Sequence, residues 1–227
     1  MFTCFRRMKP ARTIRRTTRG PNAAAWQPRL EVLEDRLVLS PTIIATISFG
    51  SSRAGDLTAN PVSNRVYAAQ EDVPAIAVIN GVTNAVSSIV PTLGYHTGID
   101  ADPITNRIYV AQQFAGSVRI IDGATNTVLT DLPVPGLIHT IGDLAVNPTT
   151  NRLYVIRANN NDVAVFDATS LSFLTAIPFG SPANGIAIDR GTNRVYIANP
   201  LTDRVTVIDG ATNTVLTTVP VGDNPHQ

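Results

Sequence analysis

The sequence predicts an all-β protein made of four similar units, because three short motifs recur along it in one register. The motif Asn-Arg-x-Tyr starts at residues 64, 106, 151 and 193, at spacings of 42, 45 and 42 residues. An Asn or Asp, followed by Gly or Ala, recurs sixteen residues later, and another Asn or Asp stands four residues before each copy. A period in the low forties, with short strands between Gly, Pro and Asn turns, is typical of a β-propeller blade.

Each unit reads as four short strands joined by tight turns. In the fourth unit these are the apolar stretch 185–188, a strand that starts at Arg194, the alternating stretch 204–208 and the stretch 214–219. The turn 147–151 of the third unit supplies a proline with a fixed φ and an asparagine that tolerates a left-handed conformation. We therefore expect four-stranded antiparallel blades at about 56–91, 98–134, 142–179 and 185–221.

Charge divides the chain into two regions with a boundary near residue 40. Residues 1–40 carry nine Lys or Arg and three Asp or Glu, whereas residues 41–227 carry nine Arg and fourteen Asp or Glu. The acidic body argues against nucleic-acid binding, because affinity for a phosphate backbone comes largely from cationic contacts. The single cysteine, Cys4, excludes a disulfide framework within the chain, and no apolar run approaches the roughly 18 residues of a membrane helix.

The basic segment 1–40 predicts export. It begins with the positive charge of a signal peptide but lacks the apolar stretch that should follow. Residues 28–40 (PRLEVLEDRLVLS) resemble the Leu-Glu-x-Arg-Leu segment that usually precedes the first domain of large secreted or surface proteins of planctomycetes. The resemblance implies an extracellular, cell-surface or periplasmic location.

The same segment has a second interpretation, a short amphipathic helix that docks on the protein's own domain. Leu30, Leu33 and Leu37 fit one face of such a helix. Residues 1–27 are charged and have no apolar pattern, so we expect them to be disordered in the mature protein or absent from it.

The repeats resemble those of the YVTN-repeat β-propeller family over about residues 43–227. The family's name motif appears at 108–111 (IYVA) and most completely at 195–199 (VYIAN), and the turn Asp-Gly-Ala-Thr-Asn occurs at 122–126 and 209–213. The resemblance implies a propeller of the kind found in cell-surface and periplasmic proteins, often of unknown ligand, with relatives that bind nucleic acid, haem or redox cofactors. The fold therefore leaves the function open.

A stretch before the first unit predicts an incomplete ring. Residues 42–50 match the fourth strand of a blade, as comparison with 214–222 shows, but no copies of the first three strands precede them. In a closed ring such a strand completes the last blade, which here already has its own fourth strand. We expect four blades plus one surplus N-terminal strand in an open arc with exposed apolar end faces. This implies a truncated gene product or self-association, for example of two arcs into a larger ring.

The two ends of the blades differ in how closely they repeat. The turns between the first and second and between the third and fourth strands are nearly constant, whereas the loops between the second and third strands vary. Variable loops on a rigid scaffold commonly carry binding residues. We expect the variable end to bind an unknown protein or small-molecule ligand through loop and link residues: Glu71, Asp72, Tyr95, His96, Gln112, His139 and Arg157.

The recurrent arginines favour a structural role over an anion-binding ring. Arg107 and Arg194 each stand fifteen residues before an aspartate. We expect each to form an ion pair across its own hairpin, with Asp122 or Asp209 respectively. The corresponding residues of the other units have the same expected role: Arg65, Arg152 and Asp167. The recurrent tyrosines are expected to fill the space between blades.

The histidines support an alternative function, a redox or metal-dependent enzyme module at the mouth of the central channel. His96 and His139 precede innermost strands, where the links between blades converge, so their imidazoles are candidate ligands. No carboxylate accompanies each histidine, and the chain contains no Gly-x-Ser-x-Gly, His-Glu-x-x-His, phosphate-loop or dinucleotide motif. We therefore expect a non-catalytic binding or scaffold protein without a metal or cofactor.

Overall fold

The computed structural model describes residues 43–225 except for Ile44, Ser51 and 137–139. Our predictions for the first forty residues, both the export segment and the amphipathic helix, therefore lie outside the described residues. In the described ranges, no helix reaches the length and hydropathy of a membrane span.

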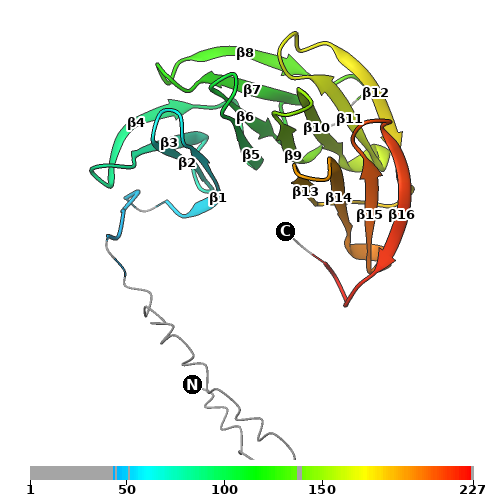
Figure 1. The fold of residues 1–227 in the computed structure, drawn as a ribbon. Helices are drawn as coiled ribbons and strands as arrows, with labels where there is room; N and C mark the ends of the chain where they lie inside the picture. Colours follow the sequence, from blue (N-terminus) through cyan, green and yellow to red (C-terminus); the bar gives the residue numbers. More distant parts are fainter. Residues whose placement is uncertain (1–42, 44, 51, 137–139, 226–227) are drawn as a thin grey trace, which may run out of the picture. The chain divides into compact units, whose positions relative to one another are not determined.

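The described strands form four antiparallel sheets of four strands each, and every sheet is made of strands consecutive in sequence (Figure 1). The first sheet contains β1 (Ala54–Asn60), β2 (Arg65–Gln70), β3 (Ala75–Asn80) and β4 (Ala85–Pro91). The second contains β5 (His96–Asp102), β6 (Arg107–Gln112), β7 (Ser117–Asp122) and β8 (Val128–Pro133). The third contains β9 (Ile141–Asn147), β10 (Arg152–Arg157), β11 (Asp162–Asp167) and β12 (Phe173–Pro178). The fourth contains β13 (Gly185–Asp189), β14 (Arg194–Asn199), β15 (Arg204–Asp209) and β16 (Thr214–Pro220). The prediction of an all-β propeller fold with four four-stranded blades is confirmed.

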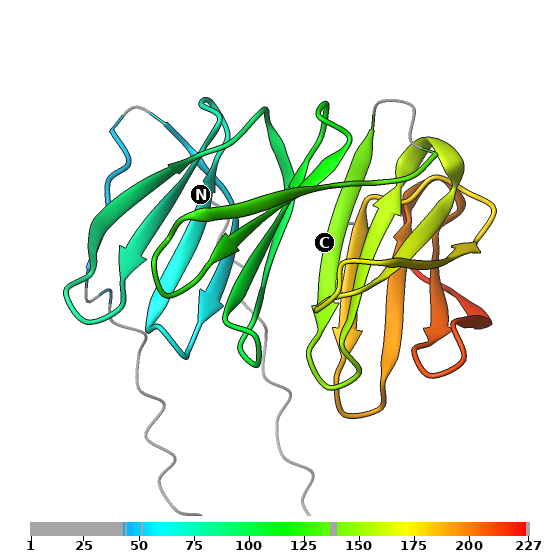
Figure 2. The ribbon, with the colours of Figure 1, turned by 90° about the horizontal axis from the view of Figure 1, so that it is seen from above.

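The strands run between two ends of the sheets (Figure 2). One end, here called the turn face, carries the turns between first and second strands and between third and fourth strands. The other end, the loop face, carries the loops between second and third strands and the links between sheets. Two short 3-10 helices, Ala158–Asn160 and Pro200–Thr202, lie in loops of the loop face.

Asparagines in the left-handed conformation close the turns between first and second strands. The φ angle is 50° at Asn64, 55° at Asn106 and Asn151, and 53° at Asn193. Asparagine tolerates this conformation better than most residues, because its short side chain bonds locally to the backbone. The sequence repeats Asn at these positions because the turn requires it.

Three apolar clusters fill the seams between consecutive sheets. At the first seam, Tyr67, Ile76 and Val78 pack with Ile108 and Val110 of the second sheet. Analogous clusters join the second sheet to the third and the third to the fourth. The inner strands β1, β5, β9 and β13 lie next to one another in that order, so the sheets follow an arc in Figure 1. Burial of these faces is the main stabilising term for such a fold.

The segment before the first sheet does not form the surplus strand expected over residues 42–50, and that prediction is wrong. Its described residues belong to no strand. Ile47 and Phe49 instead pack on the outer face of the first sheet, against Ala77 and Ile79. The physical reason is that an added strand needs an open sheet edge, and the edge of β15 that would accept it already pairs with β16.

The expected ion pairs across each hairpin, between Arg107 and Asp122 and between Arg194 and Asp209, are also absent, and we correct that prediction. In both aspartates one carboxylate oxygen accepts two backbone N–H groups of its own turn, at 2.7 and 3.0 Å. These bonds, from the N–H of Thr125 and of Thr212 above all, lower the pKa of the two carboxyls. The carboxylates therefore stabilise turns. In the third sheet, Arg152 lies 3.6 Å from the Asp167 carboxylate.

The arginines of the first two sheets cross the seam to the next sheet instead. Nη1 of Arg107 donates to the carbonyls of Ala168 and Thr169, both at 3.0 Å. Nη1 of Arg65 bonds to the carbonyls of Gly123 and Ala124 at 2.6 and 2.9 Å. A guanidinium in the turn of one blade thus caps the third-to-fourth-strand turn of its neighbour.

The tyrosines accompany these arginines across the seams. The hydroxyl of Tyr109 donates to the carbonyl of Ala168 at 2.9 Å, and that of Tyr67 to the side-chain oxygen of Asn126 at 2.9 Å. At the third seam Tyr154 is equally buried, but its hydroxyl has no partner among the described residues. Arg152 there bonds to its own neighbour, the Asn151 carbonyl. The third seam therefore relies on apolar packing without these bonds.

Candidate functional site

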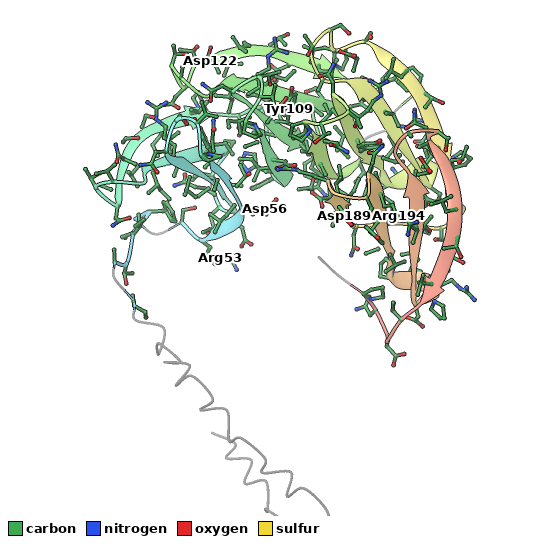
Figure 3. All side chains as sticks on the ribbon, viewed as in Figure 1. Arg53, Asp56, Tyr109, Asp122, Asp189 and Arg194 are labelled. Atoms are coloured by element: carbon green, nitrogen blue, oxygen red, sulfur yellow. The ribbon has the colours of Figure 1, made fainter. Side chains whose placement is uncertain are left out.

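A cavity of about 370 Å³ opens on the loop face between the inner strands β1 and β5. We call it the channel-mouth cavity, because the inner strands of a propeller surround its channel. Asp56, which belongs to it, and Arg53, at its rim, are labelled in Figure 3. The start of β1, the end of β2 with its following residue, and the start of β5 supply its lining: Ala54, Gly55, Asp56, Ala69, Gln70, Glu71, His96 and Thr97.

Hydrogen bonds between loops and links hold the walls of this cavity in place. The N–H of Glu71 donates to the Arg53 carbonyl at 3.0 Å, which fixes the loop after β2 against the start of β1. Both carboxylate oxygens of Asp56 accept backbone N–H groups, one from Leu57 at 2.8 Å and one from Ile99 of the second sheet at 2.9 Å. Asp56 thus joins the two sheets that form the cavity.

Gln70 is the polar group of the cavity that the fold itself does not use. Its side chain is only 5% exposed, and no hydrogen bond of its amide to another described residue exists. The amide is not among the fully buried side-chain groups that lack a partner, so its polar end reaches the solvent of the cavity. The amide therefore presents a donor and an acceptor to whatever occupies the cavity.

The equivalents of Gln70 in the second and third sheets are bonded within the fold, whereas that of the fourth sheet is bonded only in part. In the second sheet, the amide of Gln112 accepts the Leu93 N–H at 2.7 Å and donates to Ser117 and Asp131 at 3.0 and 2.9 Å. In the fourth sheet, Asn199 accepts the hydroxyl of Thr206 at 2.7 Å. The Nδ2 of Asn199 has no partner among the described residues, and Asn199 lines a smaller cavity of about 180 Å³, so the first and fourth sheets both leave part of this repeat position unbonded.

Two residues expected to bind ligand are structural, and we correct both. Gln112 is fully buried. Arg157, 7% exposed, holds Asp162 through a bidentate pair at 2.7 and 2.6 Å and donates to the Pro135 carbonyl at 2.5 Å. Their variation between repeats reflects different ways of closing each loop, because each loop has its own acceptors for these side chains.

His96 lines the channel-mouth cavity, as one of the candidate ligand-binding residues. Its Nε2 lies 2.6 Å from the Thr92 hydroxyl. Burial lowers the pKa of the imidazole, and a bond to the Gln70 carbonyl opposes this in part. His139 lies outside the described residues, so the expected approach of the two histidines stays a prediction. Among the described residues, no three His, Cys, Asp or Glu side chains are grouped to hold a metal ion.

Glu71 and Asp72 lie at the rim of the cavity and share one partner. Nη2 of Arg53 is 3.4 Å from the Glu71 carboxylate and 3.3 Å from that of Asp72. The hydrogen bond from Arg53 lowers the pKa of Asp72. All three side chains are largely exposed, so the rim is charged and accessible.

Tyr95 belongs to an exposed aromatic pair on the same face. Its ring meets that of Phe114 edge-on, with centroids 6.5 Å apart, and the rings are 52% and 63% exposed. Exposed aromatic side chains with a polar tip are favourable contact residues. The sequence analysis missed Phe114, although its place in a variable loop was a usable signal.

The channel contains a second group of carboxylates, on the inner strands of the second and third sheets. Asp100 and Asp143 each bond to the next inner strand, through the N–H of Val146 at 2.9 Å and that of Ile186 at 3.0 Å. Burial raises the pKa of both carboxyls, that of Asp143 to about 7. Arg190 lies 4.0 Å from Asp100. These carboxylates join inner strands, as Asp56 does.

The fold is similar to known structures, whereas the sequence matches no known family. No family model matches the chain, and no curated protein matches its sequence. Solved structures with this fold include hydrazine synthase of Kuenenia stuttgartiensis, with a TM-score of 0.66 and 14% sequence identity. The match covers 78% of this chain and 52% of the other, so this chain spans about half the length of the structure it matches. At this identity the likeness shows the fold alone.

Proposed function

We propose that the chain is a non-catalytic binding domain that holds a ligand in the channel-mouth cavity of its loop face. The observation that supports this most strongly is Gln70, a residue of low exposure that lines the cavity and whose amide has no partner among the described residues. The amide of its equivalent in the second sheet, Gln112, is bonded internally through both its oxygen and its nitrogen. A fold that places an unused polar group at an open cavity has the features of a ligand pocket.

The lining favours a ligand with hydrogen-bond donors or a positive charge. It contains the carboxylates of Asp56 and Glu71, the amide of Gln70 and the imidazole of His96, but no Lys or Arg. Organic anions would meet these carboxylates without a compensating cation in the lining. We therefore propose small amines and polyols as the ligand class, with the Tyr95–Phe114 pair available for apolar contact at the same face.

The test is a nuclear magnetic resonance titration of the full chain with a panel of small amines, polyols and organic acids. We expect amide signals of Gln70, His96 and Thr97 to shift with amines or polyols. The substitution Gln70→Ala should weaken that binding at least about tenfold, since it removes the only amide side chain that lines the cavity.

The matched control is Gln113→Ala, which makes the same change on the loop face outside the cavity. It should leave binding unchanged. If the panel shifts no signal of the cavity, or if Gln70→Ala binds as tightly as the unaltered chain, the proposed site is wrong.

We propose that the chain is also an exported relative of the YVTN-repeat propellers. The repeats at spacings of 42, 45 and 42 residues, each coinciding with one sheet, support the relationship, and the segment 28–40 supports export. Fractionation of the native protein tests the location. Cytoplasmic protein that retains its first forty residues would contradict export.

A further inference from the structure

The outer face of the fourth sheet carries the same donors that join the sheets internally. Side chains alternate along a strand, so Val195 and Ile197, which pack on the third sheet, place Tyr196 on the opposite face. Tyr196 is only partly buried and Arg194 is exposed, whereas Tyr67, Tyr109 and Tyr154 are fully buried. Neither Arg194, labelled in Figure 3, nor Tyr196 forms a side-chain hydrogen bond within the described residues.

The outer face of the first sheet carries the matching acceptors. The turn 80–84 corresponds to the turn 122–126, which accepts Arg65 and Tyr67 at the first seam. Asn84 has a φ of 53°, close to the 60° of Asn126. Its turn is exposed, and no arginine or tyrosine of the described chain reaches it.

A largely apolar cavity of about 300 Å³ lies beside this turn. Ile47 and Phe49 form one wall and Leu57, Val66 and Ile79 of the first sheet form the other, with Gly81 and Asn84 at its edge. A tyrosine ring that entered it would have its hydroxyl near Asn84, which is the arrangement of Tyr67 and Asn126 at the first seam.

We propose that a second copy of this chain binds here, with its fourth sheet against the first sheet of this copy. Tyr196 enters the cavity between Ile47 and Ile79, and Arg194 bonds to the carbonyls of the turn 81–84. Between two chains, the contact reproduces the bonds of the first and second internal seams, because both donors and both acceptors are of the same chemical kind in the same order.

The contact is head-to-tail, since it joins two different surfaces. Such contacts generate a closed ring if the rotation closes and a filament if it does not. Two copies that each contribute four sheets form a closed pair with two identical contacts. The contact also buries an exposed apolar surface of the first sheet, and such a surface is unfavourable for an isolated chain.

Sedimentation and light scattering of the full chain over a range of concentrations test the proposal. We expect a reversible species of twice the 24.2 kDa chain mass. Tyr196→Glu on the donor face and Leu57→Glu on the acceptor face should each weaken association at least about tenfold, since aromatic anchors dominate interface energies. Leu57 is 53% exposed, so its substitution spares the core. The matched control Leu129→Glu, 49% exposed on the second sheet, should not change association.

Mixing the two variants distinguishes this contact from others. A mixture of Tyr196→Glu and Leu57→Glu chains retains one intact donor face and one intact acceptor face, so it should form a one-to-one pair that neither variant forms alone. Cooperative thermal unfolding of each variant confirms that it is folded. A chain that stays monomeric at all concentrations, an association that either variant leaves unchanged, or a mixture that does not recover pairing would overturn the proposal.

Discussion

The turn face and the loop face use the same residue types for different purposes. On the turn face, Arg65 and Arg107 reach across a seam and Asp122 caps its own turn. On the loop face, Arg53 pairs with exposed carboxylates at the rim of a cavity. Constant sequence therefore marks groups that bond within the fold, and part of the variable sequence surrounds space that the fold leaves open.

Variation alone does not identify a binding residue. Gln70 and Gln112 occupy the same repeat position and are the same amino acid, yet only Gln112 is bonded internally. The difference comes from the loops that follow, because the second sheet offers Ser117 and Asp131 as partners. A ligand site in this fold is thus recognised by an unused polar group.

The largest expected contrast between the faces concerns two tyrosines. Tyr109→Ala removes a fully buried ring and its bond to the Ala168 carbonyl, so it should lower the free energy of unfolding by about 3–5 kcal/mol. Tyr95→Ala on the loop face removes a ring that is 52% exposed and should cost about 1 kcal/mol or less. Urea denaturation measures both. Equal losses would remove the distinction between the faces.

The arginines should show the next largest contrast. Arg107→Met keeps much of the side chain's bulk but loses two charge-assisted bonds to the carbonyls of Ala168 and Thr169, so we expect a loss of about 1.5–3 kcal/mol. Arg53→Met removes a solvent-exposed pair and should leave the urea midpoint unchanged, because exposed ion pairs contribute little. A larger loss of stability for Arg53→Met than for Arg107→Met would contradict the structural role of Arg107.

Two glycines provide a contrast in backbone packing. A Cβ at Gly123 would lie 2.8 Å from the Asn106 carbonyl oxygen, so Gly123→Ala should destabilise the turn face by about 1–3 kcal/mol. A Cβ at Gly94 on the loop face meets nothing within 4 Å, so Gly94→Ala should be neutral or slightly stabilising. Thermal unfolding compares the two variants directly.

The last contrast concerns the channel between the faces and depends on pH. Burial raises the pKa of Asp143 to about 7, above the ordinary value of an unfolded aspartate. The folded chain therefore holds this proton more tightly, and the contribution to stability is present below about pH 4 and lost as the pH rises towards 7. The slope is at most about 1.4 kcal/mol per pH unit for one proton.

Asp143→Asn should remove this slope between pH 4 and 7. The opposite contribution of His96, whose pKa burial lowers, should then remain, so that stability rises with pH up to its ordinary pKa. If the stability of Asp143→Asn falls with pH as steeply as that of the unaltered chain, the slope belongs to another group, such as Asp100, whose pKa is also raised.

The repeat pattern predicted the fold because every sheet carries its own copy of the turn signals. Asn64 and its equivalents lie in the left-handed turns that their residue type predicts. The sequence did not predict the partners of the arginines, because Arg107 and Asp122 are directly opposite in register while the Arg107 side chain points across the seam. Strand register predicts which residues are neighbours within one sheet, whereas contacts between sheets can be predicted only when the positions of the sheets are known.

The candidate site was predicted only in part. Glu71 and His96 line the cavity that the structure shows, but Gln70 was not among the residues that we expected to bind ligand. Its importance depends on the absence of a bonding partner, which no residue pattern reveals. Arg157 was expected to bind ligand because the sequence does not show its acceptors. The fold brings Asp162 and the Pro135 carbonyl to its guanidinium.

The most direct test of the division between the faces is a saturation stability scan of two segments in the same sheet. All substitutions in the turn 122–126 and in the loop 113–116 are compared by their unfolding free energies. We expect most turn substitutions to destabilise the chain, above all at Asp122, Gly123 and Asn126, and most loop substitutions to be neutral. Loop substitutions that cost as much as turn substitutions would contradict it.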